Sequence, residues 1–133
     1  MAKRRRNGPR RLWPYDLLHF VELDEFRDDW VGLGLDSEHD LFELQLSIMG
    51  DPVAAPLVEG TGGLRKMRFA PRRWRRGKSG SVRVCYAYFE NHWLVLLVMA
   101  YAKNEQETLT AHEKTAIKAY FARVQRWLDE RSR

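Results

Sequence analysis

The chain has 133 residues, 44% of them apolar, which suits one globular domain and leaves little room for a second. Cys85 is the single cysteine and the four histidines are scattered, so the sequence offers neither a disulfide framework nor the ligand spacing of a metal site. No apolar stretch has the length of a signal-sequence core or a membrane span. We therefore expect a soluble, cytoplasmic protein without metal, cofactor or membrane contact.

The net charge of +5 conceals two basic blocks. Residues 3–11 contain six Lys and Arg side chains and residues 65–83 contain nine, and neither block contains an acid. Between Arg11 and Gly63, twelve acids stand against a single basic residue, Arg27. This segregation indicates one polyanion-binding face, with the acidic part of the chain turned away from it. The alternative is that charge runs are ordinary solvated surface, and it weighs most for residues 3–11.

The chain begins with an arm and a strand. Residues 1–13 are basic, lack periodicity and hold few apolar side chains, so we expect a disordered arm followed by one domain over residues 14–133. The arm either folds on a partner or has little role. The apolar residues 17–21 predict the first strand.

Two short helices come next. Asp24 is a candidate cap for the first, which carries Phe26 and Trp30 on its apolar face and stops at two glycines. Asp36 or Ser37 can cap the second helix. The apolar positions of this second helix recur at helical spacing and are Leu41, Leu44 and Ile48, flanked by Phe42 and Met49.

Three strands fill the second half of the chain. Residues 64–69 predict a short strand after the glycine-rich segment 60–63. Residues 82–89 and 93–101 predict two longer strands, and their short connection indicates an antiparallel hairpin. The last strand is apolar on both faces, so we expect it in the centre of the sheet.

A final helix is predicted from a capping box, in which Thr110 caps the Glu113 amide and Glu113 reaches back. Its apolar stripe is expected to pack on the sheet rather than to bind a cofactor, and consists of Ile117, Tyr120, Phe121, Val124, Trp127 and Leu128. The order of one strand, two helices, three strands and a helix predicts an α+β domain with an antiparallel sheet of about four strands.

Strand alternation groups three cations. Lys66 and Arg68 project from the same face of their strand. If Arg83 on the next strand points the same way, the three converge beside small residues that leave room for a ligand. The alternative is three surface cations on a half-exposed sheet.

A cluster of this kind suits RNA cleavage, because the 2′-hydroxyl of RNA is a built-in nucleophile and no metal is required. The site then needs a base, an acid for the departing 5′-oxygen and fixed positive charge for the phosphate. Crowding by like charge makes Lys66 a candidate base. The chain has no Walker loop, GxSxG elbow or HExxH helix, and no helix follows the glycines at 60–63, which argues against a dinucleotide site.

Three motifs occur in order along the chain: GTGGLRKMRF (60–69), RRGKSGSVRVCYAYF (75–89) and VMAYAKNEQETLT (98–110). Together they resemble the RelE superfamily of bacterial toxins, and within it the HigB-like members, over roughly residues 17–130. The resemblance implies the RelE-like α+β fold and an mRNA interferase, a ribosome-dependent endoribonuclease that inhibits translation. It also implies a cognate antitoxin, of the helix-turn-helix HigA-like kind.

The resemblance also implies roles for single residues. Lys66 and Arg68 look like the base and the phosphate clamp, and Arg83 looks like the arginine that stabilises the transition state. Lys103 matches the lysine of a Lys-Arg pair, but Asn104 replaces the arginine that serves as general acid.

The identity of the general acid therefore stays open among Lys103, Tyr101 and His112. The tyrosine that stacks on the nucleotide in the family has no match here, because Thr110 falls near its position. The expected catalytic residues are Lys66, Arg68, Arg83 and Lys103, and the expected RNA-binding residues are Arg65, Arg72, Arg73, Arg75, Arg76, Lys78 and Tyr101.

Two other functions remain open. One is a nucleic-acid-binding module that does not cleave. The other is a ParE-like gyrase inhibitor, which shares the superfamily fold, although ParE-like members generally lack the clustered strand cations.

Overall fold

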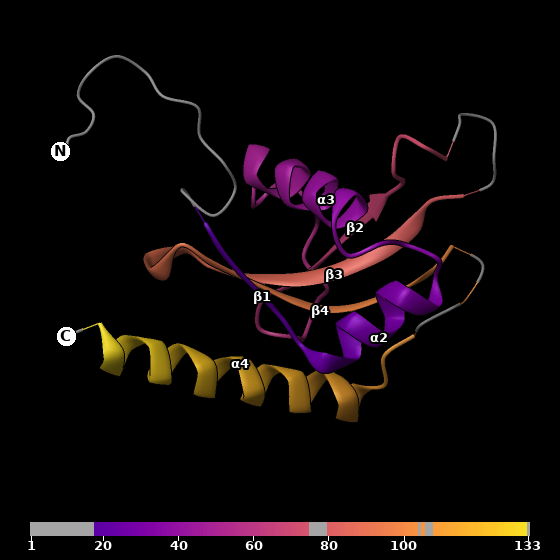
Figure 1. Cartoon of the computed structure of the whole chain (residues 1–133). Coiled ribbons are helices and arrows are strands. Elements are labelled where there is room, and N and C mark those ends of the chain that lie inside the picture. Colours follow the sequence, from indigo (N-terminus) through magenta and orange to yellow (C-terminus); the bar gives the residue numbers. More distant parts are fainter. Residues whose placement is uncertain (1–17, 75–79, 104, 106–107, 133) are drawn as a thin grey trace, which may run out of the picture.

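The computed structural model describes residues 18–74, 80–103, 105 and 108–132, and the arm predicted over residues 1–13 lies outside this part. The element order is the predicted one, and the fold class is α+β (Figure 1). None of the helices in the described ranges is both long and apolar enough to cross a membrane. The elements are β1 (His19–Glu22), α2 (Asp24–Gly32), α3 (His39–Gly50), β2 (Leu64–Phe69), β3 (Val82–Phe89), the short 3-10 helix η1 (Glu90–His92), β4 (Leu94–Ala102) and α4 (Ala111–Arg131).

The four strands form one sheet in the order β1-β4-β3-β2. β2, β3 and β4 form the antiparallel arrangement predicted from the hairpin, and β4 is central as its apolar faces required. β1 departs from the expected antiparallel sheet, because it pairs with β4 in parallel, with His19 opposite Leu94. A parallel pair needs a long crossover connection, and here the chain from β1 to β4 passes through α2, α3, β2 and β3.

Helix α2 covers the part of the β4 edge that the short β1 leaves open. The Leu23 amide donates to the Leu97 carbonyl at 3.0 Å, and three residues further along β4 the Asp29 carboxylate accepts the Ala100 amide at 3.0 Å. An acidic side chain thus satisfies a strand amide at an edge that could otherwise pair with another chain.

The sheet separates two apolar layers. On one face α2 and α3 bury Phe26, Trp30, Leu44 and Ile48 against the sheet, as their spacing predicted. On the other face α4 packs through Phe121 and Leu128, and Figure 1 shows α3 and α4 on opposite sides of the strands. Most of the acids between residues 11 and 63 therefore belong to the layer opposite α4.

Of the three predicted helix caps only that of α4 is confirmed, and the prediction of Asp36 or Ser37 for α3 is wrong, because the cap residue is Glu38 and makes no side-chain capping bond. Thr110 accepts from the Glu113 amide at 3.0 Å and Glu113 accepts from the Thr110 amide at 2.9 Å, so the capping box is complete. Asp36 accepts from the amides of Glu38 and Asp40, although α3 begins only at His39. The prediction for Asp24 is wrong, because it is the first helical residue of α2, where its charge favours the helix dipole without a capping bond.

Trp127 does not belong to the buried stripe of α4. Its side chain is half exposed, and the Arg131 guanidinium lies 4.3 Å from the centre of its ring. The other members of the stripe pack against the sheet. Near the same end of α4, Asp129 lies 2.7 Å from the His92 imidazole, which ties the helix to the β3–β4 connection.

Residues 60–63 form a tight turn that holds β2 against α4. Thr61 is fully buried, donates to the Val58 carbonyl and accepts the Leu64 amide. Gly62 has a φ of +73°, and a Cβ atom there would stand 2.9 Å from the Lys118 side chain. Glycine at this position permits both the backbone conformation and the close approach of α4.

Candidate functional site

The three cations predicted to converge do share one face of the sheet. Arg68 of β2 lies directly opposite Arg83 of β3, and Lys66 lies opposite Cys85, which is two residues along from Arg83. Directly paired residues of neighbouring strands point to the same side. This is the side on which α4 packs, because Cys85 belongs to the apolar layer of α4.

The cluster carries positive charge without compensation from nearby acids. Lys66 and Arg68 are exposed, whereas Arg83 is half buried and donates through Nη1 to Ser81 Oγ at 3.0 Å. No ion pair among the described residues includes any of the three cations. Three uncompensated cations over one patch of sheet produce a field suited to a phosphate group.

A β-bulge brings Tyr101 into this cluster. Cys85 pairs with Met99 but Tyr86 pairs with Leu97, so Val98 is an extra residue in β4. As a result Tyr101, and not Ala100, stands opposite Arg83. Bulges commonly redirect side chains beside functional sites, and this one aligns Arg68, Arg83 and Tyr101 in one row across three strands.

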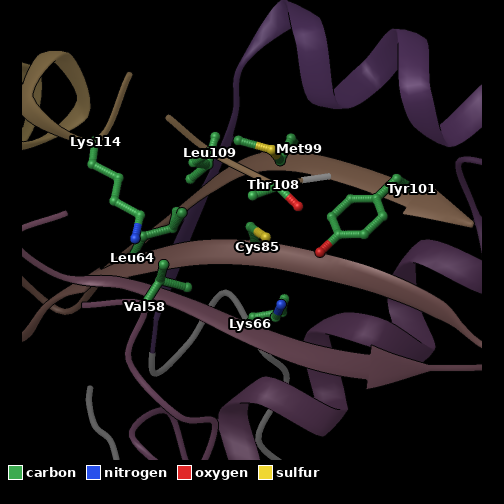
Figure 2. A pocket seen from close by; sticks show the side chains of 9 residues that line it. All are labelled: Val58, Leu64, Lys66, Cys85, Met99, Tyr101, Thr108, Leu109 and Lys114. Carbon is green, nitrogen blue, oxygen red and sulfur yellow. The ribbon is translucent and has the colours of Figure 1, made fainter. Parts of the chain in front are cut away.

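A pocket of about 220 Å³ opens beside this row, between the sheet and the start of α4. Figure 2 shows the Tyr101 hydroxyl over Cys85, the Lys66 amine rising from β2, and the Lys114 amine reaching in from α4. None of the described residues that line it is acidic. These residues are Val58, Leu64, Lys66, Cys85, Met99, Tyr101, Thr108, Leu109 and Lys114.

The three candidates for the general acid have different positions. Tyr101 is half buried and lines the pocket. Lys103 is exposed in the turn after β4, and His112 is exposed in the first turn of α4, and neither lines the pocket. Asn104 lies outside the described residues.

Arg65 and Arg73, both predicted to bind RNA, form contacts within the protein. Arg65 lies on the opposite face of β2, where its Nη1 donates to the carbonyls of Val53 and Ala55 at 2.9 and 2.7 Å. Arg72 is exposed, and its amide donates to Glu43. Arg75, Arg76 and Lys78 lie outside the described residues.

Arg73 anchors the loop after β2 to the N-terminal helices. Its Nε and Nη2 atoms approach both carboxylate oxygens of Asp40 at 2.6 to 3.1 Å, and Nη2 also donates to the Gly34 carbonyl. The Asp40 side chain is 1% exposed and accepts the Asp36 amide as well. The Arg73 guanidinium therefore holds the pKa of Asp40 below its ordinary value.

Sequence reasoning did not find Met99, Thr108, Leu109 or Lys114 as site residues. Met99 joins the site through the bulge, which alternation alone cannot predict. Lys114 belongs to a helix whose sequence pattern pointed only to its apolar stripe, and its place in the pocket depends on how α4 docks on the sheet. A basic residue directly after the capping box was the available signal.

Among the described residues, no group of three or more His, Cys, Asp and Glu side chains is placed to hold a metal ion. No family model matches the chain. Among solved structures, it is similar to a mutant of the E. coli toxin RelE in the free state, with 13% sequence identity and a TM-score of 0.48. The match covers 79% of this chain and 97% of the RelE chain.

Proposed function

We propose that this protein is a HigB-like toxin of the RelE superfamily, which inhibits translation by cutting messenger RNA on the ribosome. The observation that carries the proposal is the row of Arg68, Arg83 and Tyr101 with Lys66 beside it, on a face where no acid neutralises the described cations. The three sequence motifs that resemble the superfamily support it independently.

In the proposed reaction the RNA supplies its own nucleophile. Lys66 accepts the proton of a 2′-hydroxyl, the 2′-oxygen attacks the neighbouring phosphorus, and the bond to the 5′-oxygen breaks. The products are a 2′,3′-cyclic phosphate and a free 5′-hydroxyl. Arg68 and Arg83 stabilise the charge of the pentacovalent phosphate, because preorganised cations act most strongly where charge develops.

Tyr101 is assigned as the proton donor to the 5′-oxygen. Of the three candidates it is the one that lines the pocket, and its hydroxyl points over the sheet toward Cys85 (Figure 2). An acid must come within hydrogen-bond reach of the atom that it protonates. Lys103, exposed beyond the end of β4, is assigned to contact the RNA backbone instead.

The proposal includes two partners in the cytoplasm. The ribosome presents the message, and a cognate antitoxin of the helix-turn-helix HigA-like kind restrains the toxin. An acidic or apolar segment of such an antitoxin would find its electrostatic complement over Lys66, Arg68 and Arg83.

The test is cleavage by the purified protein with intact ribosomes and a defined message. New RNA ends that carry a cyclic phosphate and a 5′-hydroxyl are expected, and they should be absent with the Arg83→Ala variant. Binding to RNA without new ends would replace the proposal by a non-cleaving binding module. Inhibition of DNA supercoiling by gyrase without RNA cleavage would favour a ParE-like activity.

A further inference from the structure

Two lysines from different layers of the molecule enter the same pocket. Lys66 comes from β2 and Lys114 from α4, and they lie on different sides of the space in Figure 2. In the part of the chain that the structure describes, the pocket lining contains no carboxylate that could pair with either of them. Two amines without a counter-ion define a site for an anionic group.

The position of Lys114 is built into the fold. The capping box fixes the start of α4, and the Lys114 amide donates to the Thr110 carbonyl at 2.9 Å. The aliphatic part of the side chain lies against Gly60, where a Cβ atom would stand 3.4 Å from Lys114 Cδ. The amine is therefore delivered from a supported stem and not from a freely moving one.

The remaining lining suits a nucleotide. Met99 and Leu109 offer apolar surface, and Tyr101 offers an aromatic ring. Base stacking on aromatic and apolar side chains tolerates any sequence, whereas the phosphate needs the cations. The volume of about 220 Å³ is below the roughly 300–1,000 Å³ of pockets that enclose whole small molecules, so it fits one unit of a polymer that continues outside.

We propose that Lys114 is a substrate-positioning residue that holds an RNA phosphate next to the one that is cut, with the attached nucleotide in the pocket. This inference rests on the proposed function and adds to it a residue of α4. The site is thereby complete only when α4 is docked on the sheet.

Lys118 provides a matched control on the same helix. It lies one turn further along α4 and is exposed, and its stem packs on Gly62, but it does not line the pocket. Lys114→Gln and Lys118→Gln remove the same charge from the same helix and change the net charge equally. Lys114→Arg keeps the charge and tests whether the cation itself is required.

The first measurement is the binding of a short single-stranded RNA to the isolated protein at several salt concentrations. Lys114→Gln is expected to weaken binding about tenfold and to lower the slope of log affinity against log salt by about 0.7, the value for one phosphate contact on a single strand. Lys118→Gln should leave the slope unchanged, and Lys114→Arg should restore it. A purely structural role of Lys114 would not move the salt slope.

The second measurement is ribosome-dependent cleavage by the same variants. A fall in kcat/KM for Lys114→Gln, with Lys118→Gln equal to the wild type, supports the inference. If the wild type cleaves and Lys114→Gln matches it in both rate and salt slope, the inference is overturned while the proposed function stands. If the wild type binds RNA with the expected lysine dependence but never cleaves, the pocket assignment stands and the proposed function fails. Equal effects of the two glutamine variants would show only a general influence of charge and would overturn the assignment.

Discussion

Arg68 and Arg83 stand directly opposite each other on neighbouring antiparallel strands. Like charges in this relationship destabilise a sheet by roughly 0.2–1 kcal/mol, and no acid among the described residues forms an ion pair with either one. A pairing that costs stability in the free protein is understandable if an anion separates the two guanidinium groups when the protein acts.

Arg68→Thr is expected to reduce function and increase stability at the same time. The substitution removes the repulsion and places a β-branched residue in a strand, so the free energy of unfolding should rise by about 0.5 kcal/mol. Urea denaturation monitored by tryptophan fluorescence measures the change, and the cleavage assay measures the loss. A destabilised Arg68→Thr protein would contradict the view that this pair is strained.

Arg83→Ala should lower the cleavage rate about 10²- to 10³-fold, the usual loss when one preorganised donor to a developing charge is removed. Lys66→Ala should lower it about 10²- to 10⁴-fold, the usual contribution of a general base. Circular dichroism should remain unchanged, because both side chains lie on the surface of the sheet. Arg126→Ala, which removes an exposed cation of α4 away from the pocket, is the control for net charge. Full activity of both site variants would reject the proposed cluster.

Tyr101→Phe separates stacking by the aromatic ring from proton donation by the hydroxyl. The ring remains for stacking and only the hydroxyl is lost, so the cleavage rate should fall by about 10²-fold or more while RNA affinity stays near the wild-type value. Rates at saturating and limiting ribosome concentrations distinguish these effects. An equal loss of affinity would mean that the hydroxyl binds the substrate and that another group donates the proton.

Asp40→Asn should destabilise the protein at neutral pH and weaken its response to acid. The pKa of Asp40 is held below its ordinary value of 3.8 by Arg73, so its stabilising contribution is complete above about pH 4 and is lost as the pH falls through the folded-state pKa. Removing the charge at a buried acceptor should cost about 1–3 kcal/mol at pH 7.

Urea unfolding of both proteins at pH 7 and pH 3 gives the comparison. The difference between them should shrink at pH 3, while some acid sensitivity remains, since hydrogen bonds also lower the pKa values of Asp36 and Asp129. A difference in stability that does not depend on pH would show that the ion pair is not the cause.

Cleavage is expected to continue in the presence of a metal chelator, provided that polyamines keep the ribosomes intact. The reason is that Arg68 and Arg83 supply at the phosphate the positive charge that a metal ion would otherwise bring. Assays with and without chelator on the same ribosome preparation make the measurement. Loss of cleavage that returns with a metal shown to bind the isolated protein would contradict the mechanism.

The sequence by itself determined the helices and strands, and it determined that the three cations lie on one face of the sheet. The alternation of side chains along β2 and β3 depends on local geometry alone. Once these two strands are paired, Lys66, Arg68 and Arg83 can therefore be assigned to one face. The capping box of α4 is equally local, because Thr110 and Glu113 satisfy each other's amides across three residues.

The tertiary structure decided what surrounds those cations. The extra residue Val98 depends on packing between β3, β4 and α4, and it determines that Tyr101 rather than Ala100 meets Arg83. Three features join residues that are far apart in the chain. They are the parallel pairing of β1 with β4, the contact of Arg73 with the buried Asp40, and the pocket that Lys114 and Lys66 both line. Such contacts follow from how whole layers dock, and no periodicity within a single segment carries that information.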